Sequence, residues 1–132
     1  MALHSWNLQK AVYTRLTGDA TLMALITGVY DDVPEDSTYP YCVIGEESAI
    51  NSGTKTVDAV EHSLSLHVWS RYRGLYEIKT IMERIYTLLH DYDLSVTDVS
   101  FINLRQEFET TIVDADGITR HGIIRFRAVV FD

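Results

Sequence analysis

The stretch GVYDDVPEDSTYPYCVIGEE, residues Gly28–Glu47, decides how the first half of this chain folds. It contains Pro34 and Pro40, the only two prolines of the protein. Each proline fixes its own φ and moves the residue before it towards extended backbone, so the segment between the prolines should not be helical. The stretch therefore predicts a helix that ends at Gly28, an ordered acidic loop, and a first strand that begins near Tyr41.

The composition predicts one compact domain over residues 1–132. A hydrophobic fraction of 46% and a charged fraction of 23% are ordinary for a globular protein, and a chain of this length can bury a core without disulfides or metals. Its one cysteine, Cys42, lies in an apolar run, which favours a buried small hydrophobe over a reactive thiol. A lone cysteine fits assembly in a reducing cytoplasm. Met1–Lys10 has no apolar signal sequence, and no apolar run approaches the roughly 18 residues that span a membrane.

The charge balance limits the kinds of partner. The chain carries 19 acidic and 11 basic residues, a formal net charge of −8. Proteins that grip phosphate backbones rely on clustered lysine and arginine, so this balance argues against a nucleic-acid-binding surface. It is compatible with a surface past which DNA moves without sticking, because like charges repel.

Hydrophobic periodicity predicts three helices. The first covers Leu3–Leu16 with Ser5 as its N-cap, and the second covers Ala20–Thr27 with Asp19 as its N-cap. The third, Gly74–His90, has a continuous apolar stripe that should cross one face of a sheet.

Alternating apolar residues and turn signals predict four strands. They begin with Tyr41–Glu47 and Glu61–Arg71 and end with a hairpin of Phe101–Asp114 and Ile118–Phe131, joined by the turn Asp116–Gly117. The predicted fold class is α+β, with an antiparallel four-stranded sheet, helices packed on one face, and the order α-α-β-β-α-β-β. The inward residues expected on the third strand are Ile102, Leu104, Phe108 and Ile112.

The other face of this sheet is the candidate interface. Within Glu61–Arg71, leucine and valine alternate with polar residues, which puts Trp69 and Arg71 on the face away from the helices. This face is more apolar than contact with solvent requires, so contact between subunits is the hypothesis. Cover of Trp69 by a helix or a neighbouring loop is the alternative. The candidate interface residues on the sheet are Trp69, Arg71, Val113, Ile123, Val129 and Phe131. Asn51 and Lys55, in the loop predicted before Glu61–Arg71, complete the set.

Residues 48–60 are predicted to form a long loop. The segment is small and polar, contains Gly53, and lacks a periodic apolar face. Loops of this length inside a small domain tend to be functional or disordered. Two interpretations stay open, a solvated hairpin connection and a segment that orders only against a partner.

The sequence offers little catalytic chemistry. It lacks the spaced motifs of phosphate-binding loops, dinucleotide-binding folds, zinc proteases and serine hydrolases. His62 and His67 are five positions apart on one strand, so they should face opposite sides and cannot share a metal ion. A dense acidic cluster lies in the proline-punctuated loop, but its spacing does not match a calcium-binding loop. We therefore expect no catalytic residue, no metal site and no cofactor. The cluster consists of Asp31, Asp32, Glu35 and Asp36.

The run LTGDATLMALITG, followed by VYDDVP and YPYCVIGEE, closely resembles the N-terminal half of a family of small phage proteins. These are the tail terminators, or tail-completion proteins, of long-tailed phages and of phage-like gene transfer agents. The resemblance rests on Leu16–Asp19, Val29–Asp31, Pro34, Tyr39–Tyr41 and Gly45–Glu46. It continues through the SLSLHVWSR strand into the third helix, and the C-terminal hairpin matches mainly in pattern.

The resemblance implies an α+β subunit of a virion ring, typically a hexamer. Such a ring caps the tail tube, stops its polymerisation and presents the surface that joins the head-side connector, while DNA passes through its lumen. The family has no known catalytic residues to carry over. One alternative is another neck component of the virion, a connector or a stopper. The other is a small enzyme that uses histidine or aspartate residues.

Overall fold

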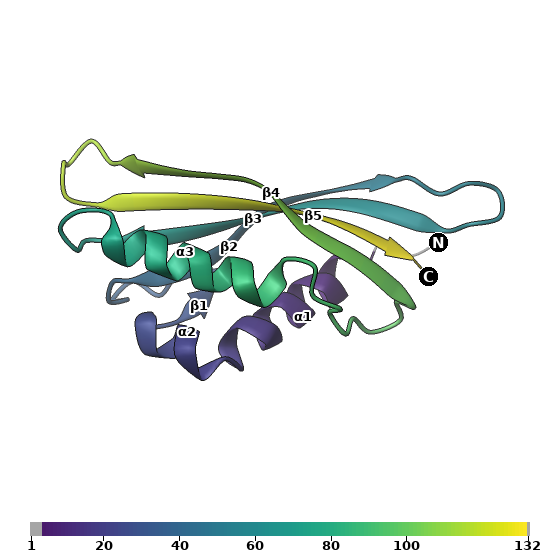
Figure 1. Cartoon of the computed structure of the whole chain (residues 1–132), viewed down its shortest axis with the longest axis horizontal. Coiled ribbons are helices and arrows are strands. Elements are labelled where there is room, and N and C mark those ends of the chain that lie inside the picture. Colours follow the sequence, from purple (N-terminus) through teal and green to yellow (C-terminus); the bar gives the residue numbers. More distant parts are fainter. Residues whose placement is uncertain (1–3, 132) are drawn as a thin grey trace.

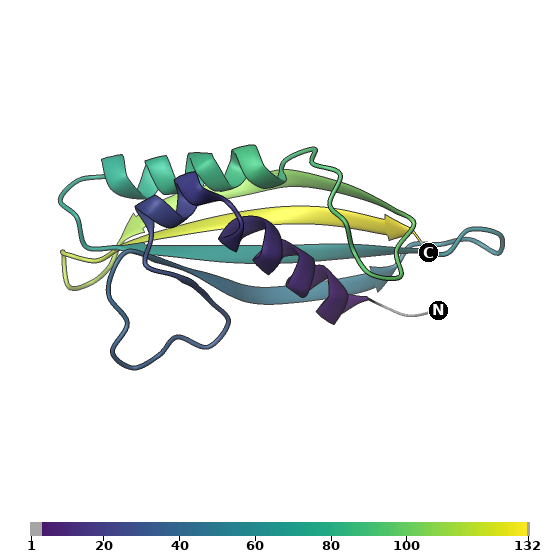
Figure 2. The same ribbon diagram turned by 90° about the horizontal axis from the view of Figure 1, so that it is seen from below.

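The computed structural model describes residues 4–131, and its five strands form one sheet with the three helices on a single face (Figures 1 and 2). The strand order is β1-β2-β3-β5-β4. The predicted α+β class is confirmed, and so is the placement of the helices. The elements are α1 (Ser5–Thr17), α2 (Ala20–Leu25), β1 (Val29–Tyr30), β2 (Tyr41–Asn51), β3 (Ala59–Ser70), α3 (Tyr76–Leu89), β4 (Phe101–Val113) and β5 (Arg120–Phe131).

The sheet has one more strand than the sequence predicted. The two-residue strand β1 runs parallel to the start of β2, with Val29 beside Cys42 and Tyr30 beside Val43. The four long strands pair antiparallel, as predicted. Two residues are too few to show any periodicity, so the prediction of four strands missed β1.

The helix ends follow the predicted signals in part. Asp19 caps α2 as predicted, because its Oδ2 accepts a hydrogen bond of 2.8 Å from the backbone N–H of Leu22. Ser5 is not an N-cap; His4 takes this position in α1, with a left-handed φ of 64° and no side-chain cap. Leu3, with which the predicted first helix begins, lies outside the described residues. The second helix ends at Leu25 rather than Thr27.

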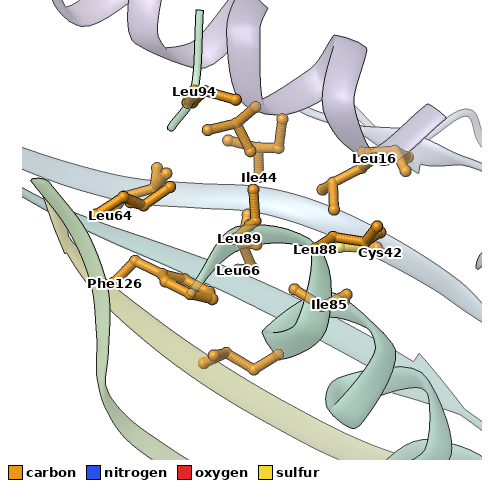
Figure 3. Packing of buried hydrophobic residues seen from close by; sticks show 14 of the residues in the cluster. Leu16, Cys42, Ile44, Leu64, Leu66, Ile85, Leu88, Leu89, Leu94 and Phe126 are labelled. Atoms are coloured by element: carbon orange, nitrogen blue, oxygen red, sulfur yellow. The ribbon is translucent and has the colours of Figure 1, made fainter. Parts of the chain in front are cut away.

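The core fills the space between the helices and one face of the sheet. Helix α3 contributes its apolar stripe as the sequence predicted, except that Leu75, expected as the first member, precedes the helix and is 37% exposed. Figure 3 shows Ile85 and Leu89 of this helix gathered with Leu66 and Phe126 of the sheet. Burial of such a side chain stabilises the fold by about 1.5–3 kcal/mol relative to exposure. The stripe consists of Ile78, Ile81, Met82, Ile85, Leu88 and Leu89.

A β-bulge in β4 reverses the predicted facing of its second half. The register with β5 shifts between Gln106 and Phe108, and an extra residue in one strand exchanges inward and outward side chains beyond it. Phe108 and Ile112, predicted to point inward, are instead 44% and 48% exposed. Val113, predicted on the uncovered face, pairs with Arg120 and lies on the helix side of the sheet.

The predicted long loop is largely a regular hairpin, so the range 48–60 is wrong. Strand β2 continues to Asn51 and β3 begins at Ala59, which leaves only residues 52–58 outside the strands. The paired backbone extends to Asn51 beside Val60. The signal was hidden because small and polar residues follow a second bulge, between Ile44 and Glu47, and do not alternate. The end of this hairpin projects beyond the body of the molecule (Figures 1 and 2).

Candidate functional site on the uncovered face of the sheet

A row of four polar and aromatic side chains, Glu46, His67, His121 and Trp69, crosses the uncovered face; we call it the Glu46–Trp69 row. The Oε1 of Glu46 lies 2.7 Å from Nε2 of His67, whose Nδ1 lies 2.7 Å from Nε2 of His121. The His121 ring stacks on Trp69 with 3.8 Å between ring centroids and 10° between planes. Three strands, β2, β3 and β5, therefore meet through contacts between their outward side chains.

The bulge in β2 places Glu46 in the Glu46–Trp69 row. Gly45 sits within the register shift between Ile44 and Glu47, and a Cβ at Gly45 would lie 2.5 Å from Cδ2 of His67. Only a glycine leaves room for the imidazole to lie across the strand. The extra residue then turns Glu46 towards His67 on the uncovered face.

Burial and neighbouring groups lower the pKa values of two side chains in the Glu46–Trp69 row. Partial burial lowers the pKa of His121, and the adjacent His67 lowers that pKa further. The hydrogen bond from His67 lowers the pKa of Glu46. The face thus favours a neutral His121 beside an ionised Glu46.

Two cation–π contacts lie next to the Glu46–Trp69 row. The guanidinium of Arg71 lies 4.7 Å from the centroid of the Tyr39 ring, and its Nε donates a hydrogen bond of 3.2 Å to Oγ1 of Thr119. The guanidinium of Arg125 lies 5.0 Å from the centroid of the Phe108 ring. Apolar, aromatic and charged groups therefore alternate over this face, a mixture found at protein–protein interfaces.

The structure brings together some of the predicted interface residues and separates others. Trp69 is half-buried and stacked, while Arg71 is exposed at the end of β3. Three half-buried residues of β5, Ile123, Val129 and Phe131, follow the same alternation as His121. Val113 lies on the other face of the sheet. Asn51 and Lys55 lie on the projecting hairpin, away from the Glu46–Trp69 row. Glu46 and His121 were not among the predicted interface residues, because the bulge and the cross-strand register leave no local pattern in the sequence.

The remaining reactive groups form no catalytic arrangement among residues 4–131. Burial raises the pKa of Cys42 to about 12, which keeps its thiol protonated. His62 is fully buried on the helix side, where its Nδ1 lies 2.7 Å from Oε1 of Glu47. As predicted, it faces away from His67. Within this range no three His, Cys, Asp or Glu side chains are arranged to hold a metal ion.

None of the helices between residues 4 and 131 is both long and apolar enough to cross a membrane.

One sheet face is packed on helices, and the other is bare and rich in contact groups. These features define a class of small α+β proteins whose distinctive residues lie on an exposed sheet face rather than in a catalytic cleft.

Comparison with known proteins identifies the family. The family described as tail completion protein gp17 matches residues 10–131. The tail completion protein gp17 of Bacillus phage SPP1 is 30% identical over 128 residues, which cover 97% of this chain and 95% of the relative. The chain therefore belongs to the tail completion protein gp17 family, as a structural protein of the virion tail and not an enzyme.

Two solved structures have the same fold. A chain in the virion of a native gene transfer agent particle superposes with a TM-score of 0.86 at 27% identity, covering 95% of both chains. The structure of the bacteriophage SPP1 gp17 protein superposes with a TM-score of 0.68 at 26% identity, covering 99% of this chain and 92% of that one. The resemblance to phage tail-completion proteins is thus confirmed, a similar chain is present in a gene transfer agent virion, and the family is that of a structural protein rather than of a small enzyme.

Proposed function

We propose that this protein is a tail terminator, which assembles into a ring at the end of the tail tube. The ring stops polymerisation of the tube and joins it to the head-side connector. Six copies are expected in the ring, as the family resemblance implies. DNA passes through the lumen without specific binding, and the net charge of −8 per copy supports this because it disfavours adhesion of phosphate backbones.

The observation that carries the proposal is the uncovered sheet face. A monomer has no evident need for a stacked tryptophan and a chain of polar contacts across three strands on a bare surface. A ring subunit needs two different lateral surfaces, because each copy contacts its neighbours head to tail. We assign the face around His121 and Trp69 as one of these two surfaces.

The test is particle size with and without the tube. The purified protein, alone and mixed with its tail tube protein, is measured by light scattering and imaged by negative-stain electron microscopy. Closed rings, or caps at one end of each tube together with shorter tubes, are the expected result. A protein that stays monomeric and leaves the tube length unchanged contradicts the proposal.

Another position in the neck, as a connector or a stopper, is the second candidate. Charge alone favours it as much as the first, since any neck ring surrounds the DNA path. Gold labelling of this chain in intact particles separates the two. A label at the tube end supports the terminator, and a label on the portal side supports the alternative.

A further inference from the structure

A groove lies between α1 and the β1 edge of the sheet, well apart from the uncovered face. Its volume is about 570 Å³. Helix α1 contributes Trp6 and Tyr13, which are 61% and 47% exposed, and Tyr30 with the exposed Asp31 and Asp32 forms the opposite side. Exposed aromatic rings beside carboxylates suit a ligand that carries both an apolar side chain and a positive charge.

The Asp31 carboxylate is positioned by the groove itself. Its Oδ2 accepts a hydrogen bond of 3.1 Å from Nε2 of Gln9, which is also on α1. Lys10 lies on the same helix and lines the groove as well. With two carboxylates against one ammonium group, the groove remains net negative.

The β2–β3 hairpin has the complementary chemistry at its end. The backbone N–H of Thr54 donates a hydrogen bond of 2.8 Å to the carbonyl of Val57, a turn that puts Lys55 at the tip. Lys55 is the one basic residue between Ser48 and Val60, and Asp58, on the β3 side of the turn, is the one acidic residue. Val57 is 47% exposed, and Ile50, on the adjoining strand, is 62% exposed. The Lys55 ammonium group and the exposed Val57 side chain therefore belong to the turn of the hairpin, and Ile50 lies further back on β2. This end of the hairpin projects beyond the body of the molecule (Figure 1).

We propose that this hairpin of one copy docks into the α1–β1 groove of a second copy. Lys55 then faces Asp31 and Asp32, and Val57 packs against Tyr13. The hairpin projects away from the body in both views (Figures 1 and 2), so the groove that it fills belongs to a neighbour. A projecting element and its receptor on the same chain generate head-to-tail contacts, which close into a ring when the rotation permits. This inference rests on the proposed ring and names its second lateral contact.

Cysteine cross-linking between copies tests the contact. One preparation carries Val57→Cys and the other Tyr13→Cys; they are mixed, assembled with tube protein and oxidised. A dimer that contains both variants is expected on a non-reducing gel. The native Cys42 is buried and does not compete. The control pairs Tyr13→Cys with Ile118→Cys. Ile118 is 55% exposed in the turn of the β4–β5 hairpin and should not cross-link.

Charge exchange provides the second measurement. Lys55→Glu and the double variant Asp31→Lys with Asp32→Lys should each raise several-fold the protein concentration needed for assembly. A protein that carries all three changes should recover assembly, because the attraction is restored with the signs reversed. Failure of the triple variant to recover, while each parent folds normally, contradicts the pairing.

The outcomes separate this contact from the ring itself. Rings without the Val57–Tyr13 cross-link overturn the docking and leave the proposed function standing. A cross-link without rings or tube caps supports the docking and contradicts the ring. Neither rings nor cross-link overturns both, and a cross-link from Val57→Cys to the tube protein alone overturns the docking by assigning the hairpin to another partner.

Discussion

The Nδ1 atom of His67 lies 2.7 Å from Nε2 of His121, so one ring must donate the shared hydrogen bond and the other must accept it. The second nitrogen of His67 lies 2.7 Å from the Glu46 carboxylate and must donate to it. When both rings are neutral, His121 donates to His67. When His67 carries protons on both nitrogens, it donates to His121, which must then hold its own proton on Nδ1. Two protonated rings leave two N–H groups and two positive charges opposed.

This arrangement predicts a stability that falls with acidification. The lowered pKa of His121 lies below its value in the unfolded chain, so the unfolded state binds more protons as the pH drops below about 6.5. The lowered pKa of Glu46 acts in the same direction at still lower pH. Urea unfolding at about pH 7.5 and about pH 5.5 should show a smaller loss for His121→Gln than for the parent protein. Equal losses in both proteins contradict the assignment.

Trp69→Ala and Phe131→Ala should impair assembly more than folding. Both side chains are half-buried on the uncovered face, so each substitution should cost about 1–2 kcal/mol of folding free energy, while an aromatic anchor lost from an interface weakens association strongly. Calorimetry and ring counts on the same samples measure the two effects. Phe126→Ala is the control, because this fully buried ring should cost about 3–5 kcal/mol. If the two variants unfold as Phe126→Ala does, Trp69 and Phe131 are core residues.

The sequence predicted those parts of the fold that can be recognised from a few residues close together in the chain. The α3 stripe and the Asp19 cap are such parts, since each needs only a few neighbouring residues to be recognised. The facing of Phe108 and Ile112 depends on a register shift with β5, and no residue of β4 alone reveals this shift. A single bulge therefore reversed a correct alternation from that point onward.

The candidate site was predictable to the same extent. Trp69 was found because β3 alternates without interruption, and the structure keeps it on the uncovered face. His121 and Glu46 were missed, because their meeting at His67 requires the order β2-β3-β5 and the bulge at Gly45. Cross-strand neighbours of this kind are set by topology and not by sequence distance.

Amide exchange should divide the β2–β3 hairpin into two parts. The amide of Ser52 donates to the carbonyl of Ala59, so residues 48–52 are expected to be protected in the free subunit. Residues 53–58 make only short-range hydrogen bonds within an exposed turn, so they should exchange faster than residues 48–52 and become protected on assembly if the tip docks as proposed. Hydrogen exchange measured by mass spectrometry, before and after addition of tube protein, tests both statements. Rapid exchange over 48–52 would contradict the paired strands, and unchanged exchange of the tip in assembled rings would contradict its docking.

Asp19 should contribute to stability through both its cap and its ion pair. Its two carboxylate oxygens accept hydrogen bonds of 2.9 Å and 2.7 Å from Arg84 of α3, and the bond from Arg84 is the main reason that its pKa is lowered to about 2. Because the folded pKa lies below the unfolded one, this contribution is present above about pH 3.8 and is lost as the pH falls towards about 2. Asp19→Ala removes both the cap and the pair and should cost about 2–4 kcal/mol.

The comparison with Asp19→Asn divides this cost. Asparagine retains a side-chain oxygen for the N–H of Leu22 but loses the charge that Arg84 contacts, so Asp19→Asn should cost less than Asp19→Ala. Urea unfolding at neutral pH measures the order. If both variants lose the same stability, the cap contributes nothing and the interaction with Arg84 accounts for the whole effect.

Gly122 and Gly45 provide a matched test of the covered and uncovered faces. A Cβ at Gly122 would lie 2.5 Å from Sδ of Met82 and 3.2 Å from Cδ1 of Ile78, so Gly122→Ala forces β5 and α3 apart and should cost about 1–3 kcal/mol. At Gly45 the nearest atom is Cδ2 of His67, whose ring lies on the open side and can rotate away. Gly45→Ala should therefore change the histidine ring resonances and the pH dependence more than the free energy of unfolding. A Gly122→Ala protein as stable as the parent would contradict the close packing of α3 on β5.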